Sequence, residues 1–439
     1  MTETPICDFV RAYRDANPVR LHMPGHKGAA LLGCEPWDIT EVDGADALYE
    51  ANGVIRESER IAGSFFGAHT FYSTEGSSQC IRAMLALAVR RISGRATVLA
   101  ARNVHKTFLT AAALLDFDPV WIGTQDGYLS ASVSPEDIAR AIRPDTAAVY
   151  LTAPDYCGNL PDLAPIAAAS HAHGVPLLVD NAHGAYLKFL SPSRHPIDLG
   201  ADACCDSAHK TLAALTGAAY LQIAPSDRFG FAEGAKDALA LFGSTSPSYL
   251  ILQSLDRMNA EFPALPARLA ALTKSLATLK TRLAAHGYAL SGDEPIKLTI
   301  DANAFGYTGD ALAKMLSERG VTVEFHDPER IVMMFSPWNT ERDLQTAQTA
   351  LLGVEKRAPV ERTLLPKSEP VSVCSVREAM LGPKERLPVA QCVGRVLAEP
   401  CVGCPPAVPI RMCGERIDEA AAAWFRHYGT ETLSVRKNV

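Results

Sequence analysis

The feature that most constrains the fold is a regular alternation of short apolar runs with helix-length segments between residues 97 and 223. The segments 135–142 and 163–173 between these runs have helical periodicity. Strands that alternate with helices favour a mainly parallel sheet with right-handed crossovers. The centre of the chain is therefore predicted to be an α/β domain. The apolar runs that we expect to be strands are 97–100, 119–122, 147–152, 176–180 and 218–223.

The pattern changes on either side of this region. After Gly287 the segments 297–300, 321–325 and 331–335 are expected to be strands and 309–319 and 341–352 helices, which is typical of a small α+β unit. A charged, proline-containing stretch follows, and then a tail with helices expected at 376–380 and 418–428. We predict four parts, which are an N-terminal arm (1–40), a large domain (41–286), a small α+β domain (287–356) and a linker with a C-terminal tail domain (357–439).

Composition excludes several classes of protein. The 439 residues carry a net charge of −7, so the chain has no basic stripe for nucleic acid. No apolar stretch of about 18 residues suggests a membrane span, and the first residues lack the pattern of a secretory signal. We therefore expect a cytoplasmic protein that binds neither nucleic acid nor a membrane.

Four of the eleven cysteines have a spacing that raises the question of a metal. Cys401 and Cys404 are separated by two residues, and Cys392 and Cys413 flank them at equal distances. Four such thiols could bind zinc, although the segments between them differ from the usual paired knuckles. We expect reduced structural thiols and no metal site.

A lysine follows the apolar stretch around Cys204 and Cys205, in the sequence Ser207-Ala208-His209-Lys210. Upstream, the run 177–179 leads directly into Asp180, which places an acid at the carboxyl end of a predicted strand, where ligands bind in α/β sheets. A pyridoxal phosphate enzyme needs this pair, because an amine holds the cofactor's aldehyde and a carboxylate keeps its pyridine nitrogen protonated. Lys210 and Asp180 are thus the central candidates for cofactor binding and catalysis.

Three further stretches fit this hypothesis, each with a structural alternative. Gly76-Ser77-Ser78 precedes a helical run and could cradle a phosphate at a helix N-terminus, or could be an ordinary helix cap. His105 follows the run 97–100 and could stack on the cofactor ring, although a lone histidine is often structural. His26 and Lys27 lie in a glycine-rich loop that is either functional or an exposed arm.

With these residues placed, the sequence resembles the Orn/Lys/Arg decarboxylase family of pyridoxal phosphate enzymes in its short bacterial form. The motifs that carry the resemblance run nearly end to end. They are residues 22–28, 38–41, the phosphate turn, His105-Lys106-Thr107, 180–184, 207–212, the Ser244–Tyr249 loop and the Pro-Pro-x-x-Pro-Ile…Gly-Glu tail. Three positions differ from the residues usual in the family: Ala407 stands for a glycine, Cys413 for a proline and Tyr186 for a histidine. The resemblance places these positions toward the substrate and the entrance, so it predicts the cofactor chemistry more firmly than the substrate.

The resemblance implies a fold and a set of roles. The fold is the fold type I of pyridoxal phosphate-dependent transferases, with a mainly parallel seven-stranded sheet in the large domain and smaller α+β domains at the C-terminus. Lys210 would carry the cofactor, Asp180 would pair with the pyridine nitrogen, and His105 would stack on the ring. His183 would lie near the ring hydroxyl. The phosphate would be held by Gly76, Ser77, Ser78, Ser207, His209 and, from a partner subunit of a homodimer or larger assembly, Thr245 and Ser246.

The expected reaction is decarboxylation of a basic L-amino acid, which is arginine, lysine or ornithine. Lys210 or His209 would return a proton to the α-carbon, and Glu415, with His26 and Lys27, is a candidate for substrate binding. Two alternatives stay open at this point. An aminotransferase or a Cβ lyase would share the lysine, the aspartate and the phosphate loop, and a non-catalytic homologue that binds pyridoxal phosphate would retain them as well.

Overall fold

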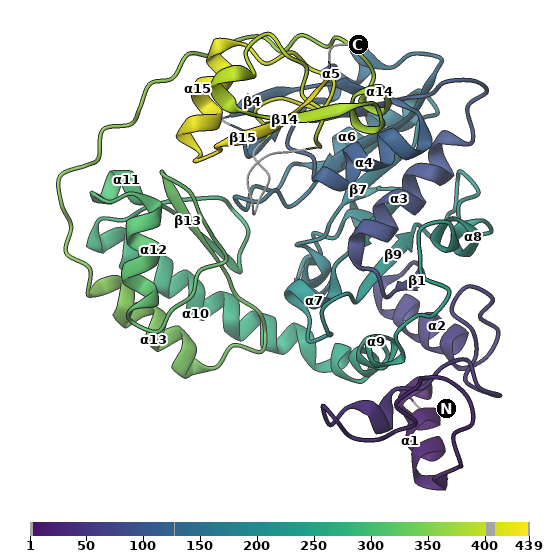
Figure 1. Cartoon of the computed structure of the whole chain (residues 1–439). Helices are drawn as coiled ribbons and strands as arrows, with labels where there is room; N and C mark the ends of the chain where they lie inside the picture. The colour runs from purple at the N-terminus through teal and green to yellow at the C-terminus, as the bar shows by residue number, and fades with distance from the viewer. Residues whose placement is uncertain (1–2, 127, 401–408, 438–439) are drawn as a thin grey trace. The chain divides into compact units, whose positions relative to one another are not determined.

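The computed structural model describes residues 3–126, 128–400 and 409–437 (Figure 1). The chain divides into two units that interleave in sequence. The first unit contains residues 1–93, 146–153 and 162–269, and the second contains residues 94–145, 154–161 and 270–439.

The main sheet has seven strands in the order β1-β9-β8-β7-β6-β2-β3. β6, β7 and β8 are parallel to one another, and β2 is parallel to β3. β9 is antiparallel to both β8 and β1, so β1 runs in the same direction as β8. The predicted, mainly parallel seven-stranded sheet is confirmed. Its strands are β1 (His69–Ser73), β2 (Thr97–Ala100), β3 (Asp118–Trp121), β6 (Thr146–Thr152), β7 (Leu177–Asp180), β8 (Ala203–Asp206) and β9 (Ala219–Ile223).

Helix α3 (Gly76–Val89) packs against β8 and β9 within the first unit (Figure 1). Nine of its residues are buried, and its apolar side chains lie on all sides, as is typical of a helix enclosed by protein. It therefore forms part of the core that supports the loops at the sheet edge. The other helices of this unit are α1 (Pro5–Ala16), α2 (Val54–Phe66), α6 (Leu163–Ala172), α7 (Ala208–Thr211), α8 (Ala235–Ala240) and α9 (Tyr249–Glu261).

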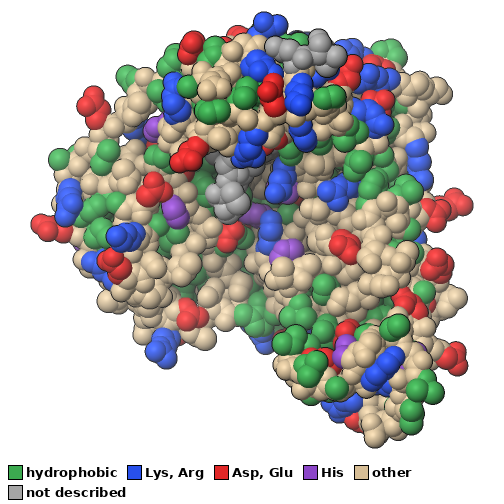
Figure 2. Space-filling view, viewed as in Figure 1, with side chains coloured by type: hydrophobic (Ala, Val, Ile, Leu, Met, Phe, Trp, Pro, Cys, Tyr) green, Lys and Arg blue, Asp and Glu red, His purple; other side chains and the backbone are tan. Residues whose placement is uncertain are grey.

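The N-terminal arm is anchored by α1 and exposed beyond it. Helix α1 contacts α2 and α9 and buries Ile6 and Val10, which lie four residues apart on one face. The Cys7 backbone N–H donates to Asp256 on α9 at 2.8 Å. The chain that follows exposes a group of apolar side chains, and Figure 2 shows such side chains gathered on this arm at the lower right. The group, which we call the apolar arm patch, contains Val19, Leu21, Met23, Leu31 and Leu32.

The second unit contains a four-stranded antiparallel sheet in the order β10-β11-β13-β12. Its strands are β10 (Ala289–Ser291), β11 (Lys297–Asp301), β12 (Phe325–His326) and β13 (Arg330–Met334). The predicted strand 321–325 is wrong, because only its last residue belongs to β12. The N–H of Val321 donates to the carbonyl of Leu316, so this segment closes the end of a helix instead. The helices of this part are α10 (Leu265–His286), α11 (Ala302–Phe305), α12 (Gly309–Ser317) and α13 (Glu341–Leu352).

The C-terminal segment of the second unit has an antiparallel pair of strands, β14 (Lys384–Pro388) and β15 (Thr432–Arg436), that the sequence analysis did not predict. Leu433 and Val435 of β15 join Phe425 in a buried cluster that also includes Phe325 and Val332. The tail therefore shares a core with the small sheet inside the second unit. The remaining elements of this unit are α4 (Lys106–Leu115), β4 (Thr124–Asp126), β5 (Ser130–Ser132), α5 (Pro135–Ala141), α14 (Val376–Leu381) and α15 (Glu419–His427).

Across residues 3–126, 128–400 and 409–437, none of the helices combines the length and the apolar character that a membrane crossing requires.

Candidate active site

The strand directions of the first unit bring three predicted loops to one edge of the sheet. Asp180 ends β7 and is in register with Cys205 on the parallel strand β8. Across β9, Asp206 of β8 pairs with Tyr220, and Tyr72 of β1 pairs with the same residue. The carboxyl ends of β1, β7 and β8 therefore lie at the same edge, where open α/β sheets bind their ligands.

Two of these loops form hydrogen bonds to two adjacent residues, Gly217 and Ala218, that come just before β9. The N–H of Gly76 donates to the carbonyl of Gly217 at 2.7 Å. The Nδ1 of His209 is 2.9 Å from the carbonyl oxygen of Ala218, and the backbone N–H of His209 donates to the same oxygen at 3.3 Å. The start of α3 and the loop that carries Lys210 are thus tied to adjacent peptide groups.

The geometry around the start of α3 suits an anion. Gly76 has a φ of 69°, a left-handed conformation that favours glycine, and α3 begins there. Ser77 and Ser78 are half-buried in its first turn, where backbone N–H groups lack intrahelical acceptors. The Ser207 hydroxyl is buried without a hydrogen-bond partner. A buried hydroxyl in this state needs an acceptor, and a phosphate oxygen would provide one. These residues fit the phosphate of the expected cofactor.

Asp180 is 2% exposed and accepts three hydrogen bonds. The donors are the Tyr150 hydroxyl at 3.2 Å, the Ala182 backbone N–H at 3.2 Å and the Cys205 thiol at 3.4 Å. Hydrogen bonds of this kind favour the ionised form of a carboxyl group. A buried carboxylate at the strand end is the group that a protonated pyridine nitrogen requires. Sequence reasoning missed Tyr150 and Cys205, because the register between strands that places them beside Asp180 cannot be read from the pattern of a single strand.

Lys210 lies in the short helix α7, half-buried, and its backbone N–H donates to the carbonyl of Ser207. Next to it, burial lowers the pKa of His209, which favours a neutral ring. Because the Ala218 carbonyl can only accept, the ring proton of a neutral His209 lies on Nδ1 and Nε2 is an acceptor. The loop therefore presents an amine and an imidazole at the sheet edge.

Five other predicted site residues belong to the first unit. His183 is buried in the loop after β7, whereas Thr245 and Ser246 are exposed in the turn before α9. His26 lies in the arm, with its Nε2 3.2 Å from Asp38, and Lys27 donates to the carbonyl of His22. The roles of these five residues toward the cofactor and the substrate stay predictions.

His105 and Glu415 belong to the second unit. His105 is exposed at the start of α4, where its Nδ1 accepts from the Thr107 N–H at 3.2 Å, and its stacking role stays a prediction. The carboxylate of Glu415 is buried in a bidentate ion pair with Arg102, at 2.7 and 2.8 Å. The Met412 N–H also donates to it at 2.7 Å. Three donors thus already engage this carboxylate, its substrate role stays a prediction, and Arg102 is a partner that sequence reasoning missed.

The predicted cysteine spacing lies partly outside the described residues, because Cys401 and Cys404 fall in 401–408. Cys392 and Cys413 are buried, and their thiols donate to backbone carbonyls. Elsewhere in the described residues, ligand atoms of His195, Cys204 and Asp206 lie within 4.8 Å of one another. Asp206 already accepts from His195, Asn181 and Gln222. This group is therefore explained as a buried hydrogen-bond network.

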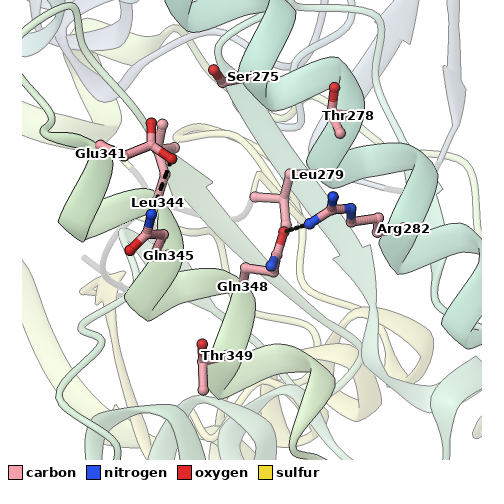
Figure 3. Close-up of a pocket in the computed structure, with 9 residues that line it drawn as sticks. All are labelled: Ser275, Thr278, Leu279, Arg282, Glu341, Leu344, Gln345, Gln348 and Thr349. Atoms are coloured by element: carbon pink, nitrogen blue, oxygen red, sulfur yellow. Dashed lines mark hydrogen bonds between the residues drawn. The ribbon is translucent and has the colours of Figure 1, made fainter.

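A surface groove between α10 and α13 of the second unit has a volume of about 510 Å³ (Figure 3). Its side chains bond to one another, with Arg282 donating to Gln348 at 2.9 Å and Gln345 to Glu341 at 3.2 Å. None of the predicted site residues lines it. The groove is a seam between two helices and is not part of the candidate active site.

Comparisons with known proteins identify the family of the chain. The family model of the Orn/Lys/Arg decarboxylase major domain matches residues 4–270. An arginine decarboxylase of Bacillus subtilis is 29% identical over 463 residues, covering 95% of this chain and 92% of that protein. An arginine decarboxylase of Halalkalibacterium halodurans is also 29% identical, covering 99% of this chain and 95% of that protein.

Solved structures show the same fold. A lysine decarboxylase of Francisella novicida superposes with a TM-score of 0.80 at 17% identity, covering 99% of this chain and 81% of that chain. The constitutive lysine decarboxylase of E. coli gives a TM-score of 0.75 at 19% identity, covering 99% and 82%. The predicted fold type I architecture is thereby confirmed. With a matching family model over more than half of its length, the chain belongs to the Orn/Lys/Arg decarboxylase family of pyridoxal phosphate-dependent amino-acid decarboxylases.

Proposed function

We propose that the protein decarboxylates a basic L-amino acid, with arginine as the first candidate, and releases carbon dioxide and the corresponding amine. The observation that carries this proposal is the meeting of Asp180, the Ser207–Lys210 loop and the N-terminus of α3 at one sheet edge. Arginine comes first because the nearly full-length relatives described above are arginine decarboxylases. Lysine and ornithine are the other candidates.

The proposed roles follow from the chemistry of each side chain. Lys210 holds the cofactor through its amine, and the hydroxyls of Ser77, Ser78 and Ser207 bind the phosphate together with the N–H groups that begin α3. Asp180 holds a proton on the pyridine nitrogen. His183 lies near the ring hydroxyl in this proposal, and His105 stacks on the ring.

Pyridoxal phosphate, when bound, supplies an electron sink for the pair of electrons that remains when carbon dioxide leaves. The side chains of this protein would hold and transfer the protons of the reaction. Asp180 is held in place by three hydrogen bonds, and Lys210 would return a proton to the α-carbon. His209, with Nε2 free to accept, is the alternative proton carrier at the same edge.

The test is a panel of amino acids scored by release of carbon dioxide, with product identification. Arginine, lysine and ornithine are compared with neutral and acidic amino acids, and the Lys210→Ala variant is the control. We expect one basic amino acid to be turned over at least about a hundredfold faster than the neutral ones. An α-keto acid product together with conversion of the cofactor to its pyridoxamine form would identify an aminotransferase and reject the proposal.

We also propose a homodimer with shared sites. Thr245 and Ser246 are exposed in the chain, and the apolar arm patch lies on the surface of the same unit. Exposed apolar clusters of this kind mark protein interaction sites, and hydroxyls from a second copy would add donors to a phosphate.

Subunit complementation tests the shared site. Lys210→Ala chains are mixed with chains that carry both Thr245→Ala and Ser246→Ala under conditions that exchange subunits. If sites are shared, some mixed dimers contain one fully native site and activity returns above that of either variant alone. Absence of complementation despite measured exchange, or a fully active monomer, would reject the shared site.

A further inference from the structure

The donors around Asp180 come from three separate places in the first unit. Tyr150 lies on β6, Cys205 on β8, and the Ala182 N–H in the loop directly after β7. Asp180 is therefore held from both neighbouring strands as well as from its own loop. Such a carboxylate cannot rotate without losing at least one hydrogen bond.

The strand register explains why these two side chains meet Asp180. Cys205 is the direct partner of Asp180 across the β7–β8 pair, so both side chains lie on one face of the sheet. Tyr150 pairs with Leu178, two residues before Asp180, and so faces the same side. Cys204 and Asp206 lie on the opposite face, where both contact His195. Of the two adjacent cysteines, only Cys205 serves Asp180.

Both donors keep their protons at neutral pH. Burial, and then the neighbouring Asp180 charge, raises the pKa of Tyr150 and of Cys205 well above the ordinary values. Each side chain is fully buried, so water does not compete for its proton. A neutral hydroxyl and a neutral thiol beside a carboxylate donate to it and favour its ionised form.

These contacts bear on where a shared proton resides. A ring nitrogen and the carboxylate of Asp180 compete for one proton, and the more basic partner holds it. Donors to the carboxylate lower its basicity and thereby move the proton to the ring nitrogen.

We propose that Tyr150 and Cys205 are positioning residues that hold the Asp180 carboxylate aimed at the cofactor's pyridine nitrogen, an inference that rests on the proposed function. They touch neither substrate nor cofactor in this proposal and act only through Asp180. The thiol is the weaker donor, and the hydroxyl contributes the larger part.

The test reads the protonation state of the ring directly. The protein is reconstituted with pyridoxal phosphate labelled with ¹⁵N in the ring, and the ring nitrogen is observed by solid-state NMR. The wild-type protein is expected to give the signal of a protonated ring, and Asp180→Asn that of a neutral ring. A protein with both Tyr150→Phe and Cys205→Ala is expected to give a signal shifted toward the neutral form, with kcat lowered at least about tenfold and KM little changed.

Three variants separate positioning from packing. Cys205→Ser keeps a donor and should retain the protonated signal, and Cys204→Ala removes an equally buried thiol on the other face and should do the same. Tyr150→Phe alone, which deletes one oxygen, provides the measurement if the double variant does not fold. A protonated signal in Tyr150→Phe and in the double variant overturns the inference while the proposed function stands. A wild-type protein that takes up no pyridoxal phosphate on Lys210 overturns both.

Discussion

Replacement of Asp256 by asparagine removes a buried carboxyl group on α9 that anchors the N-terminal helix. Asp256 is fully buried. Its carboxyl group accepts hydrogen bonds from the Ser58 hydroxyl at 2.5 Å and from the Cys7 N–H of α1 at 2.8 Å. Burial is the main cause that raises its pKa from 3.8 to about 6. An asparagine oxygen can accept from the same N–H, so the substitution removes the charge and keeps the anchor.

The sign of the pH dependence follows from the direction of this shift. Because the pKa of Asp256 is higher in the folded protein, its stabilising contribution is fully present below the unfolded pKa of 3.8 and is lost as the pH rises through about 6. The difference between 3.8 and about 6 corresponds to about 3 kcal/mol, of which about 1.4 kcal/mol falls between about pH 5 and about pH 8. The Asp256→Asn protein should not lose this stability over the same pH range.

Hydrogen exchange of the backbone amides of α1 provides the assay, because opening of this helix exposes Asp256. After correction for intrinsic exchange, protection of α1 in the wild-type protein should fall about tenfold more than in Asp256→Asn between about pH 5 and about pH 8. Glu261→Gln, on the same helix but in a surface pair with Arg257, is the control. Equal pH dependence in wild type and Asp256→Asn would refute the reasoning.

Three further outcomes test the site and its surroundings. Borohydride reduction should attach the cofactor to Lys210, and a peptide map should show no adduct in Lys210→Ala; an adduct on another lysine would contradict the assignment. Asp180→Asn should keep pyridoxal phosphate bound and lower turnover on the order of 10³-fold, and near-normal turnover would contradict its role. Glu415→Gln should destabilise the protein by about 3 kcal/mol in thermal unfolding, because it leaves the buried Arg102 without its charged partner. Unchanged stability with a raised KM would instead assign Glu415 to the substrate.

The sheet and the loops at its edge could be predicted because their signals are local. The strands β6, β7 and β8 consist mostly of apolar residues, Asp180 ends β7, and Ser207 directly follows β8. A residue next to a strand end is placed by the strand itself. The resemblance to a family then supplied roles that no local pattern carries, such as that of His105.

The remaining features depend on partners that are distant in sequence. Arg102 and Glu415 lie 313 residues apart, and a buried arginine has no local signature that names its acid. β14 pairs with β15 across an intervening segment that contains α15, so neither strand has a hairpin turn to reveal it. In 321–325, the apolar alternation is that of a strand, but the peptide of Val321 closes the preceding helix.

The three residues at the end of β8 and the start of the next loop are Cys205, Asp206 and Ser207, and each faces a different environment. The register of β8 therefore determines which side chain meets Asp180. Cys205 donates to Asp180, Asp206 accepts from His195, Asn181 and Gln222 on the other face, and the Ser207 hydroxyl is left for an anion. A slip of one residue would turn Asp206 toward Asp180 and bring two buried carboxylates together, because successive side chains alternate faces. The three donors to Asp206 therefore stabilise the register in which a thiol, not an acid, meets Asp180.

Since Asn181 is the residue after Asp180, its hydrogen bond to Asp206 at 2.6 Å also joins the ends of β7 and β8. Asp180 and the loop that carries Lys210 are thus positioned by one network on the opposite face of the sheet.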